Sequence, residues 1–126
     1  MLVGIGTDIV EISRIEKVIA KHGDDFIKRI LTDSEYKAAE ARQFAVEHLA
    51  GRWACKESVA KALGCGIGES CSWHDIEIFY GKQGGPEVEL KGAAYDTARR
   101  KDIVRLKVSI SHEKHYATAM AVAVSC

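Results

Sequence analysis

Alanine occupies every second position of the segment YATAMAVAV, at 117, 119, 121 and 123. Because successive side chains of a β-strand point to opposite faces, one face of this strand would carry nothing larger than methyl groups. Such a flat surface suits a helix that packs close to it. The helix expected over about residues 46–63, which contains GRWACKESVAKALG, is small or apolar on nearly all sides, as an enclosed helix is. We therefore expect a sheet packed on a buried central helix.

The rest of the sequence alternates between strand and helix patterns. Strand patterns cover VGIGTDIV (3–10), HDIEIFY (74–80), EVEL (87–90), VRLKVSIS (104–111) and residues 116–124, with GKQGGP closing a hairpin. Helical patterns cover 12–21, a segment after the capping-box pair Thr32 and Glu35, residues 46–63 and about 93–101. No linker or repeat divides the 126 residues, which suffice for one core. The expected fold is α+β, a single domain over 1–126 with an antiparallel sheet packed on a central helix.

Overall charge and hydropathy argue against several functions. The 18 basic and 18 acidic residues give a net charge of zero, so overall charge predicts neither a nucleic-acid partner nor an anionic membrane. No segment approaches the roughly 20 apolar residues that span a bilayer, and the start resembles neither a signal nor a transit peptide. The four cysteines form no C-x-x-C pair and are expected as reduced thiols in the cytoplasm. A zinc site with Cys65, Cys71 and a histidine would match no common spacing.

Glu57 is an acidic residue inside the expected central helix. Its neighbours on the helical wheel include Ala50, Trp53 and Lys61, and this is not an ordinary solvated face. We expect the carboxylate to be at least partly buried, and a buried carboxylate without a partner costs several kcal/mol. Lys61, four residues later in the favourable order, is one candidate partner.

Asp8 lies at the end of the first expected strand. Alternation places Gly4, Gly6 and Asp8 on one face, and glycine in a strand leaves room for another backbone or a ligand. The two glycines would admit the central helix or a bound group. Asp8 could instead cap a helix that starts near Glu11, because aspartate is favoured at helix N-termini. Two carboxylates that folding alone does not require suggest a metal site formed by Asp8 and Glu57.

Three motifs carry a family resemblance: GIGTDIVEI at 4–12, RWACKESVAKALG at 52–64 and SISH at 109–112. Together they closely resemble holo-acyl-carrier-protein synthase, the short, trimeric branch of the 4′-phosphopantetheinyl transferases. The resemblance covers essentially the whole chain. It implies Mg²⁺-dependent transfer of 4′-phosphopantetheine from coenzyme A to a serine of apo-acyl carrier protein, with release of adenosine 3′,5′-bisphosphate, for fatty acid biosynthesis.

The resemblance also assigns roles to residues of the central helix. Asp8 and Glu57 would be the Mg²⁺ ligands, since Mg²⁺ prefers one or two carboxylates together with waters and phosphate oxygens. Lys61 would stabilise phosphate charge. Lys56 lies near the site in the family, but the helical wheel turns it about 100° from Glu57, so a structural role stays open. The proton of the attacking serine would pass to Glu57, directly or through a metal-bound water.

The coenzyme A end of the site is expected at Arg52, at the glycine loop and at the last turn. Backbone N–H groups of Gly64 and Gly66 would approach the coenzyme A phosphates, although both glycines also suit a helix end. By resemblance, His112 lies near the same end, with a plain turn histidine as the alternative.

Two positions depart from the family pattern, because Gln43 and Gly85 stand where relatives often carry basic residues. This puts some contacts to the adenine nucleotide or its 3′-phosphate in doubt, but not the metal pair. The remaining histidines have no supporting neighbours and are expected at the surface: His22, His48, His74 and His115.

Basic residues follow one face of the first helix, at Arg14, Lys17 and Lys21. Such a stripe is usually a solvated face, but in the family this helix docks an acidic carrier protein, so Arg14 and Lys21 are expected to bind it. The resemblance further implies a homotrimer with sites between subunits. Two alternatives are a transferase for a specialised polyketide or peptide carrier domain and a non-catalytic module that binds carrier protein.

Overall fold

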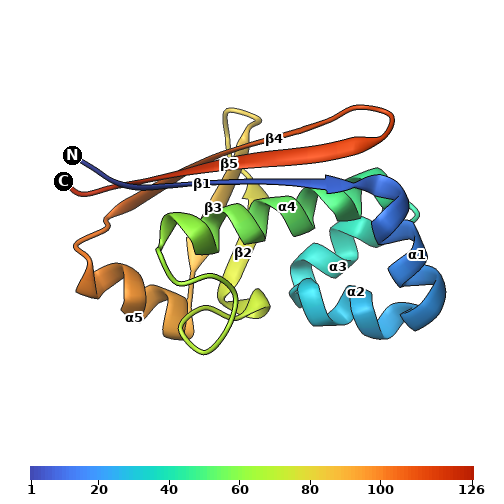
Figure 1. The fold of residues 1–126 in the computed structure, drawn as a ribbon, viewed down its shortest axis with the longest axis horizontal. Coiled ribbons are helices and arrows are strands. Elements are labelled where there is room, and N and C mark those ends of the chain that lie inside the picture. Colours follow the sequence, from blue (N-terminus) through green and yellow to red (C-terminus); the bar gives the residue numbers. More distant parts are fainter.

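The computed structural model describes all of residues 1–126 and contains five α-helices, one 3₁₀-helix and five strands (Figure 1). In chain order these are β1 (Leu2–Glu11), α1 (Ile12–His22), α2 (Asp24–Ile30), α3 (Asp33–Glu40), α4 (Val46–Ala62), η1 (Trp73–Asp75), β2 (Ile76–Tyr80), β3 (Pro86–Leu90), α5 (Gly92–Arg100), β4 (Arg105–His112) and β5 (Tyr116–Val124). None of the helices combines the length and the hydropathy that crossing a membrane requires.

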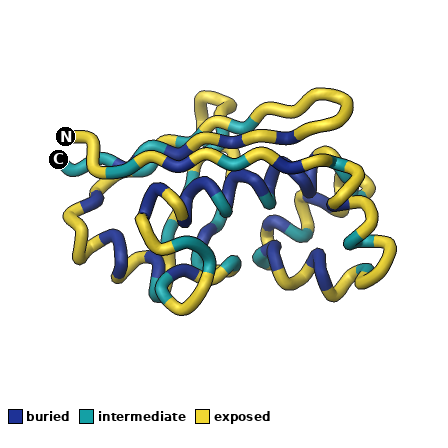
Figure 2. The backbone as a smooth tube through the Cα atoms, viewed as in Figure 1, coloured by how far each residue is buried: buried dark blue, intermediate teal, exposed yellow.

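The central helix α4 lies against one face of a three-stranded antiparallel sheet in the order β1-β5-β4 (Figure 1). The hairpin of β2 and β3 forms a separate two-stranded sheet. All four alternating alanines of β5 are buried, and α4 is buried along most of its length (Figure 2). The α+β fold with an antiparallel sheet packed on a central helix is therefore confirmed.

Glycines in β1 allow α4 to approach the strand closely. A Cβ atom on Gly6 would collide with the backbone carbonyl oxygen of Ser58, and one on Gly4 with that of Ala62. Since both obstacles are backbone atoms of the helix, a side chain at either position would force helix and sheet apart. Of the two expectations for these glycines, admission of the central helix is correct.

Several local features differ from the expectations. The sequence did not predict α2 or η1, because seven and three residues are too few to show a period. The expected capping box is present: the Thr32 N–H donates to Glu35 Oε1 at 2.7 Å, and the Glu35 N–H donates to Thr32 Oγ1 at 3.3 Å. β1 continues to Glu11, which precedes α1 without a capping side chain, so Asp8 is not a helix cap.

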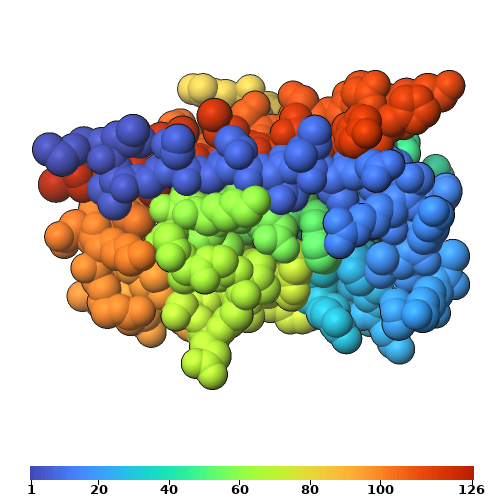
Figure 3. Space-filling model, in the orientation of Figure 1, coloured from blue at the N-terminus to red at the C-terminus, as the bar shows by residue number.

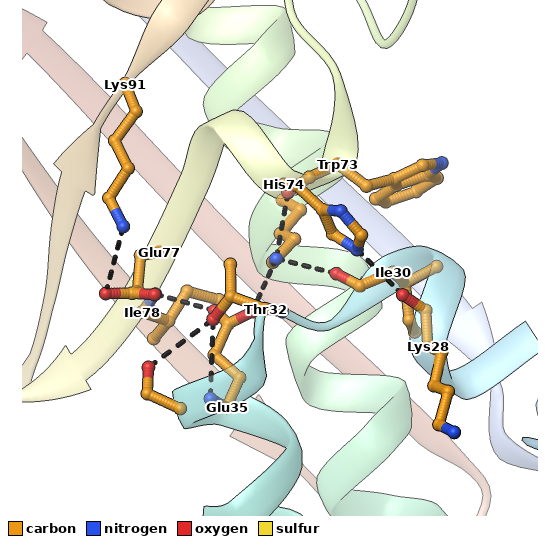
Figure 4. Close-up of polar contacts among 11 residues, drawn as sticks. Lys28, Ile30, Thr32, Glu35, Trp73, His74, Glu77, Ile78 and Lys91 are labelled. Atoms are coloured by element: carbon orange, nitrogen blue, oxygen red, sulfur yellow. Dashed lines mark hydrogen bonds and ion pairs between the residues drawn. The ribbon is translucent and has the colours of Figure 1, made fainter.

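A buried polar cluster fixes the side of α4 that faces away from the sheet (Figure 4). The Lys56 ammonium is fully buried and donates to Glu35 Oε1 at 2.7 Å, to the Ile30 carbonyl at 2.6 Å and to the Trp73 carbonyl at 2.9 Å. Glu35 in turn accepts the Ile78 N–H at 2.7 Å. Burial lowers the pKa of Lys56, and the Glu35 carboxylate opposes this shift. These contacts give Lys56 a structural role in holding α4 against α2, α3 and η1.

The outer face of the three-stranded sheet is apolar and exposed. Ile5 and Ile9 of β1 are 58% and 67% exposed, and Met120 of β5, on the same face, is 46% exposed. β1 lies along the surface above α4 (Figure 3). Isolated exposed apolar residues are ordinary, but adjacent ones on two paired strands form a patch of the kind that associates with another surface.

Candidate active site

Asp8 projects from the inner face of β1, opposite Ala119 of β5, and its backbone carbonyl accepts a hydrogen bond from Thr118 Oγ1 at 2.8 Å. Its Oδ1 lies 3.2 Å from the ammonium of Lys61, which also donates to the Thr7 carbonyl at 2.9 Å. The other carboxylate oxygen, Oδ2, is buried and has no hydrogen-bond partner. Because a buried acceptor without a donor costs free energy, this oxygen is suited to a cation.

Glu57 projects from α4 toward the same place and is half-buried. Burial is the main cause that raises the pKa of Glu57 above its usual value, the Asp8 carboxylate raises it further, and Lys61 partly offsets both. The fold therefore brings Asp8, Glu57 and Lys61 together. One lysine faces two carboxylates, so the group carries excess negative charge.

The glycine loop after α4 uses its N–H groups within the chain. The Gly64 N–H donates to the Lys61 carbonyl at 2.9 Å and the Gly66 N–H to the Ala60 carbonyl at 3.1 Å, which ends the helix. Both glycines have positive φ, 83° and 69°, as residues that end helices in the left-handed region do. These two N–H groups are not free to bind phosphate, so any contact of the two residues with coenzyme A must use other atoms.

Arg52 and His112 meet at a second place, a pocket of about 370 Å³. The remaining lining residues come from the start of α4, the segment before it and the ends of β2, β3 and β4: Arg42, Ala45, Glu47, His48, Gly51, Tyr80, Pro86 and Ile110. The Arg52 guanidinium lies 5.3 Å from the centre of the Tyr80 ring. A hydrogen bond from Arg52 is the main cause that lowers the pKa of Tyr80. Neither Gln43 nor Gly85 lines this basic pocket.

The basic pocket and the carboxylate pair lie on different sides of α4. Arg52 and Glu57 are five residues apart, which turns their side chains by about 140° around the helix axis. The predicted site residues therefore form two groups in one chain.

His48 was expected at the surface, and that expectation is wrong. It is 9% exposed and lines the basic pocket from the first turn of α4. Burial lowers the pKa of His48 to about 4, with the charges of Arg52 and Arg42 adding to the effect. The i, i+4 spacing of His48 and Arg52 was a usable signal, because it places both on one face of the helix.

Arg14 lines a third feature, a cleft of about 350 Å³ between α1, α2 and the aromatic residues of α4 and η1. Its floor is aromatic: the Trp53 and Trp73 rings lie 4.6 Å apart, and Phe26 lies 5.8 Å from Trp53. Arg29 adds a second guanidinium to the lining, which the sequence did not suggest. Lys21 is exposed on α1 but does not line the cleft.

Residues 4–121 match the family model of the 4′-phosphopantetheinyl transferase superfamily. The chain belongs to this superfamily. The holo-[acyl-carrier-protein] synthase of Vibrio cholerae is 44% identical over 122 residues, which are 97% of each chain. The crystal structure of the synthase from Neisseria meningitidis matches with a TM-score of 0.92 at 37% identity, over 99% of this chain and 100% of the other. That of the Helicobacter pylori synthase in complex with coenzyme A matches with a TM-score of 0.83 at 34% identity, over 95% and 99%.

The superfamily match spans the carboxylate pair in β1 and α4 and the basic pocket. The predicted resemblance to the holo-acyl-carrier-protein synthases is confirmed, and so is the predicted class of enzyme, a 4′-phosphopantetheinyl transferase.

Proposed function

We propose that this transferase is a holo-acyl-carrier-protein synthase, which moves 4′-phosphopantetheine from coenzyme A to a serine of apo-acyl carrier protein and releases adenosine 3′,5′-bisphosphate. Residues 1–126 act as one domain, in the cytoplasm, for fatty acid biosynthesis. The observation that carries the proposal is the buried Asp8 oxygen without a donor, beside Glu57. The name of the relatives supplies the carrier protein, and the Helicobacter pylori complex supplies coenzyme A.

Mg²⁺ is the cation that the carboxylate pair fits. No group of three or more His, Cys, Asp or Glu side chains is placed to enclose a metal. Mg²⁺ prefers one or two carboxylates and completes its shell with waters and substrate phosphate oxygens. Bound by Asp8 and Glu57, it would offset the negative charge that develops on the leaving phosphate.

Lys61 orients the carboxylate and adds positive charge for the substrate. Its ammonium holds Asp8 Oδ1 and the Thr7 carbonyl, while half of its side chain remains exposed. A substrate phosphate beside Asp8 would therefore find an ammonium already fixed in position, which lowers the cost of organising charge around the transferred group.

Arg52 and His112 bind the nucleotide end of coenzyme A. A guanidinium matches two phosphate oxygens at once, and stacking on the Tyr80 ring limits the freedom of Arg52 before the ligand arrives. Because the basic pocket and the carboxylate pair lie on different sides of α4, we infer that one coenzyme A uses the pair of one subunit and the basic pocket of its neighbour.

The protein works as a homotrimer with sites between subunits. The support from this chain is the exposed outer sheet face, where Ile5, Ile9 and Met120 would be buried against another copy. Ile9→Asp should lower the mass measured by light scattering and abolish turnover together, since association then completes the site. An active monomer would contradict this arrangement.

Arg14 and Lys21 bind the acidic carrier protein. Arg14 lies at the rim of the aromatic cleft, and positive charge there would speed association with an acidic partner. Arg14→Glu should raise the KM for carrier protein and leave the KM for coenzyme A near its original value. An equal rise in both constants would argue against docking at this surface.

The direct test is the intact mass of purified apo-acyl carrier protein after incubation with coenzyme A and this protein. We expect a gain of one phosphopantetheine with Mg²⁺ and none with EDTA. Glu57→Gln and Asp8→Ala should each lose several tenfold steps of turnover at limiting Mg²⁺, about 1.4 kcal/mol of transition-state stabilisation per step. Asp96→Asn, an exposed carboxylate on α5, is the matched control. Absence of the mass gain, or wild-type turnover in Glu57→Gln, would refute the proposal.

A further inference from the structure

The basic pocket is built around the positive end of α4. Ala45 precedes the helix and offers no capping side chain, so the N–H groups of Val46 and Glu47 have no partner, whereas that of His48 donates to the Ala45 carbonyl at 3.1 Å. Arg42, Arg52 and His112 surround this helix end, and Glu47 is the acidic residue among them. A helix N-terminus and basic side chains around one pocket form an environment for an anion.

His48 lines the same pocket and is about nine-tenths buried as a residue. Its ring makes no hydrogen bond within the chain. Only 9% of the residue is exposed, at the wall of the pocket. The charged and titratable groups around it are Arg42, Arg52 and Glu47 near the start of α4, Tyr80 at the end of β2 and His112 at the end of β4.

At neutral pH this ring is uncharged, because burial and the nearby positive charges oppose its protonation. An anion in the pocket would reverse that balance. A phosphate monoester carries about −1.5 to −2 charge at pH 7, and an opposite charge within a few ångströms favours the protonated ring.

We propose that His48 takes up a proton from solvent when a phosphate monoester enters the basic pocket, and so becomes a hydrogen-bond donor to that phosphate. This rests on the proposed function, in which the pocket holds the nucleotide end of coenzyme A. In coenzyme A the monoester is the 3′-phosphate. Each of the two phosphate groups of the pyrophosphate carries only one negative charge. The affinity for coenzyme A then rises as the pH falls, and His48 discriminates coenzyme A from 3′-dephospho-coenzyme A.

Calorimetry without carrier protein tests this independently of turnover. Coenzyme A and 3′-dephospho-coenzyme A are titrated into the protein between about pH 7 and pH 8, in buffers that differ in ionisation enthalpy. In this range the phosphate monoester, with a second pKa of about 6, is almost fully ionised and has few protons of its own to release. The variants are His48→Gln and His48→Phe, neither of which can take up a proton there. His112→Gln separates the other pocket histidine, and His74→Gln, an exposed histidine outside the pocket, is the control.

We expect proton uptake with coenzyme A by the wild type and by His74→Gln, and an affinity that rises by up to about tenfold per pH unit. Both His48 variants should lose this uptake, and 3′-dephospho-coenzyme A should cause none. Uptake that persists in the His48 variants, or that disappears only in His112→Gln, would overturn the proposal.

Failure of the proposed function would look different, since coenzyme A would then bind to none of the proteins. In that case inorganic phosphate replaces coenzyme A as the probe, and ring-proton NMR follows the signal that His48→Gln removes. A pKa for that signal unchanged by phosphate would overturn the role of His48.

Discussion

Replacing Lys56 by methionine should destabilise the protein strongly while leaving the chemistry of the folded enzyme nearly unchanged. Methionine has a similar length and no charge, so it removes the ammonium with little change in volume. The substitution leaves the buried Glu35 carboxylate without its counter-charge and the carbonyls of Ile30 and Trp73 without their donor. Because Lys56 points away from the carboxylate pair, no catalytic group is lost.

The magnitude follows from the number of contacts removed. Breaking one partner of a buried ion pair costs about 3–5 kcal/mol. Glu35 keeps two N–H donors, from Thr32 and Ile78, which places the loss toward the lower end of that range. The free energy of unfolding of a small domain is roughly 5–15 kcal/mol in total. The variant should therefore fold, but it should unfold at a much lower urea concentration than the wild type.

Urea unfolding at a fixed protein concentration measures the loss of unfolding free energy in Lys56→Met. Two further variants serve as comparisons. Glu35→Gln/Lys56→Met removes both charges and should recover part of the stability. Lys28→Met removes an exposed partner of Asp24 and should leave the urea midpoint close to that of the wild type. A loss below about 1 kcal/mol in Lys56→Met would refute the energetic argument. A hundredfold fall in kcat of the folded variant, about 2.7 kcal/mol, would refute the structural assignment.

Three further predictions test the fold and the carboxylate pair. In EDTA at neutral pH, Glu57→Gln should melt at a higher temperature than the wild type, because the raised pKa of Glu57 means that its ionised form destabilises the native state. This advantage should vanish as the pH falls below the usual value of 4.5, and its persistence there would contradict the explanation by burial and the Asp8 charge. Gly6→Ala should lower the free energy of unfolding in urea by about 1–3 kcal/mol or more. The methyl group added in Gly68→Ala would meet no atom, so that variant should stay within about 0.5 kcal/mol of the wild type. Thr32→Ala should cost about 1 kcal/mol by loss of the capping box, and no change would refute the cap.

The parts of the fold that could be predicted are those with a local pattern. The alternating alanines and the paired glycines in β1 each predict close packing, and the capping box at Thr32 predicts the start of a helix. The closeness of Asp8 to Glu57 also followed from such a pattern, since the glycines on the Asp8 side marked where the helix comes close. Short elements such as α2 lacked enough residues to show a period.

The rest depends on tertiary contacts, most of which leave no mark in the sequence. Two of the three acceptors of Lys56 are backbone carbonyls, which any residue could supply. The pocket around His48 draws residues from α4, β2 and β4, and of these neighbours only Arg52, four residues later on the same helix face, was visible in the sequence. The glycine loop could not be interpreted from sequence alone, because a left-handed helix end and a phosphate-binding loop require the same residue type.

The contacts of α4 explain how the side chains of the carboxylate pair and of the basic pocket keep their orientations around the helix. Its rotation is fixed on one side by β1, where the glycines admit the backbone of Ser58 and Ala62. On the other side Lys56 is held by three buried hydrogen bonds. A shift by one residue would turn every side chain by about 100°, remove Lys56 from its acceptors and press a larger residue against the strand. Glu57, next to Lys56 in sequence, is thereby held facing Asp8, even though burial and the Asp8 charge disfavour its ionised form.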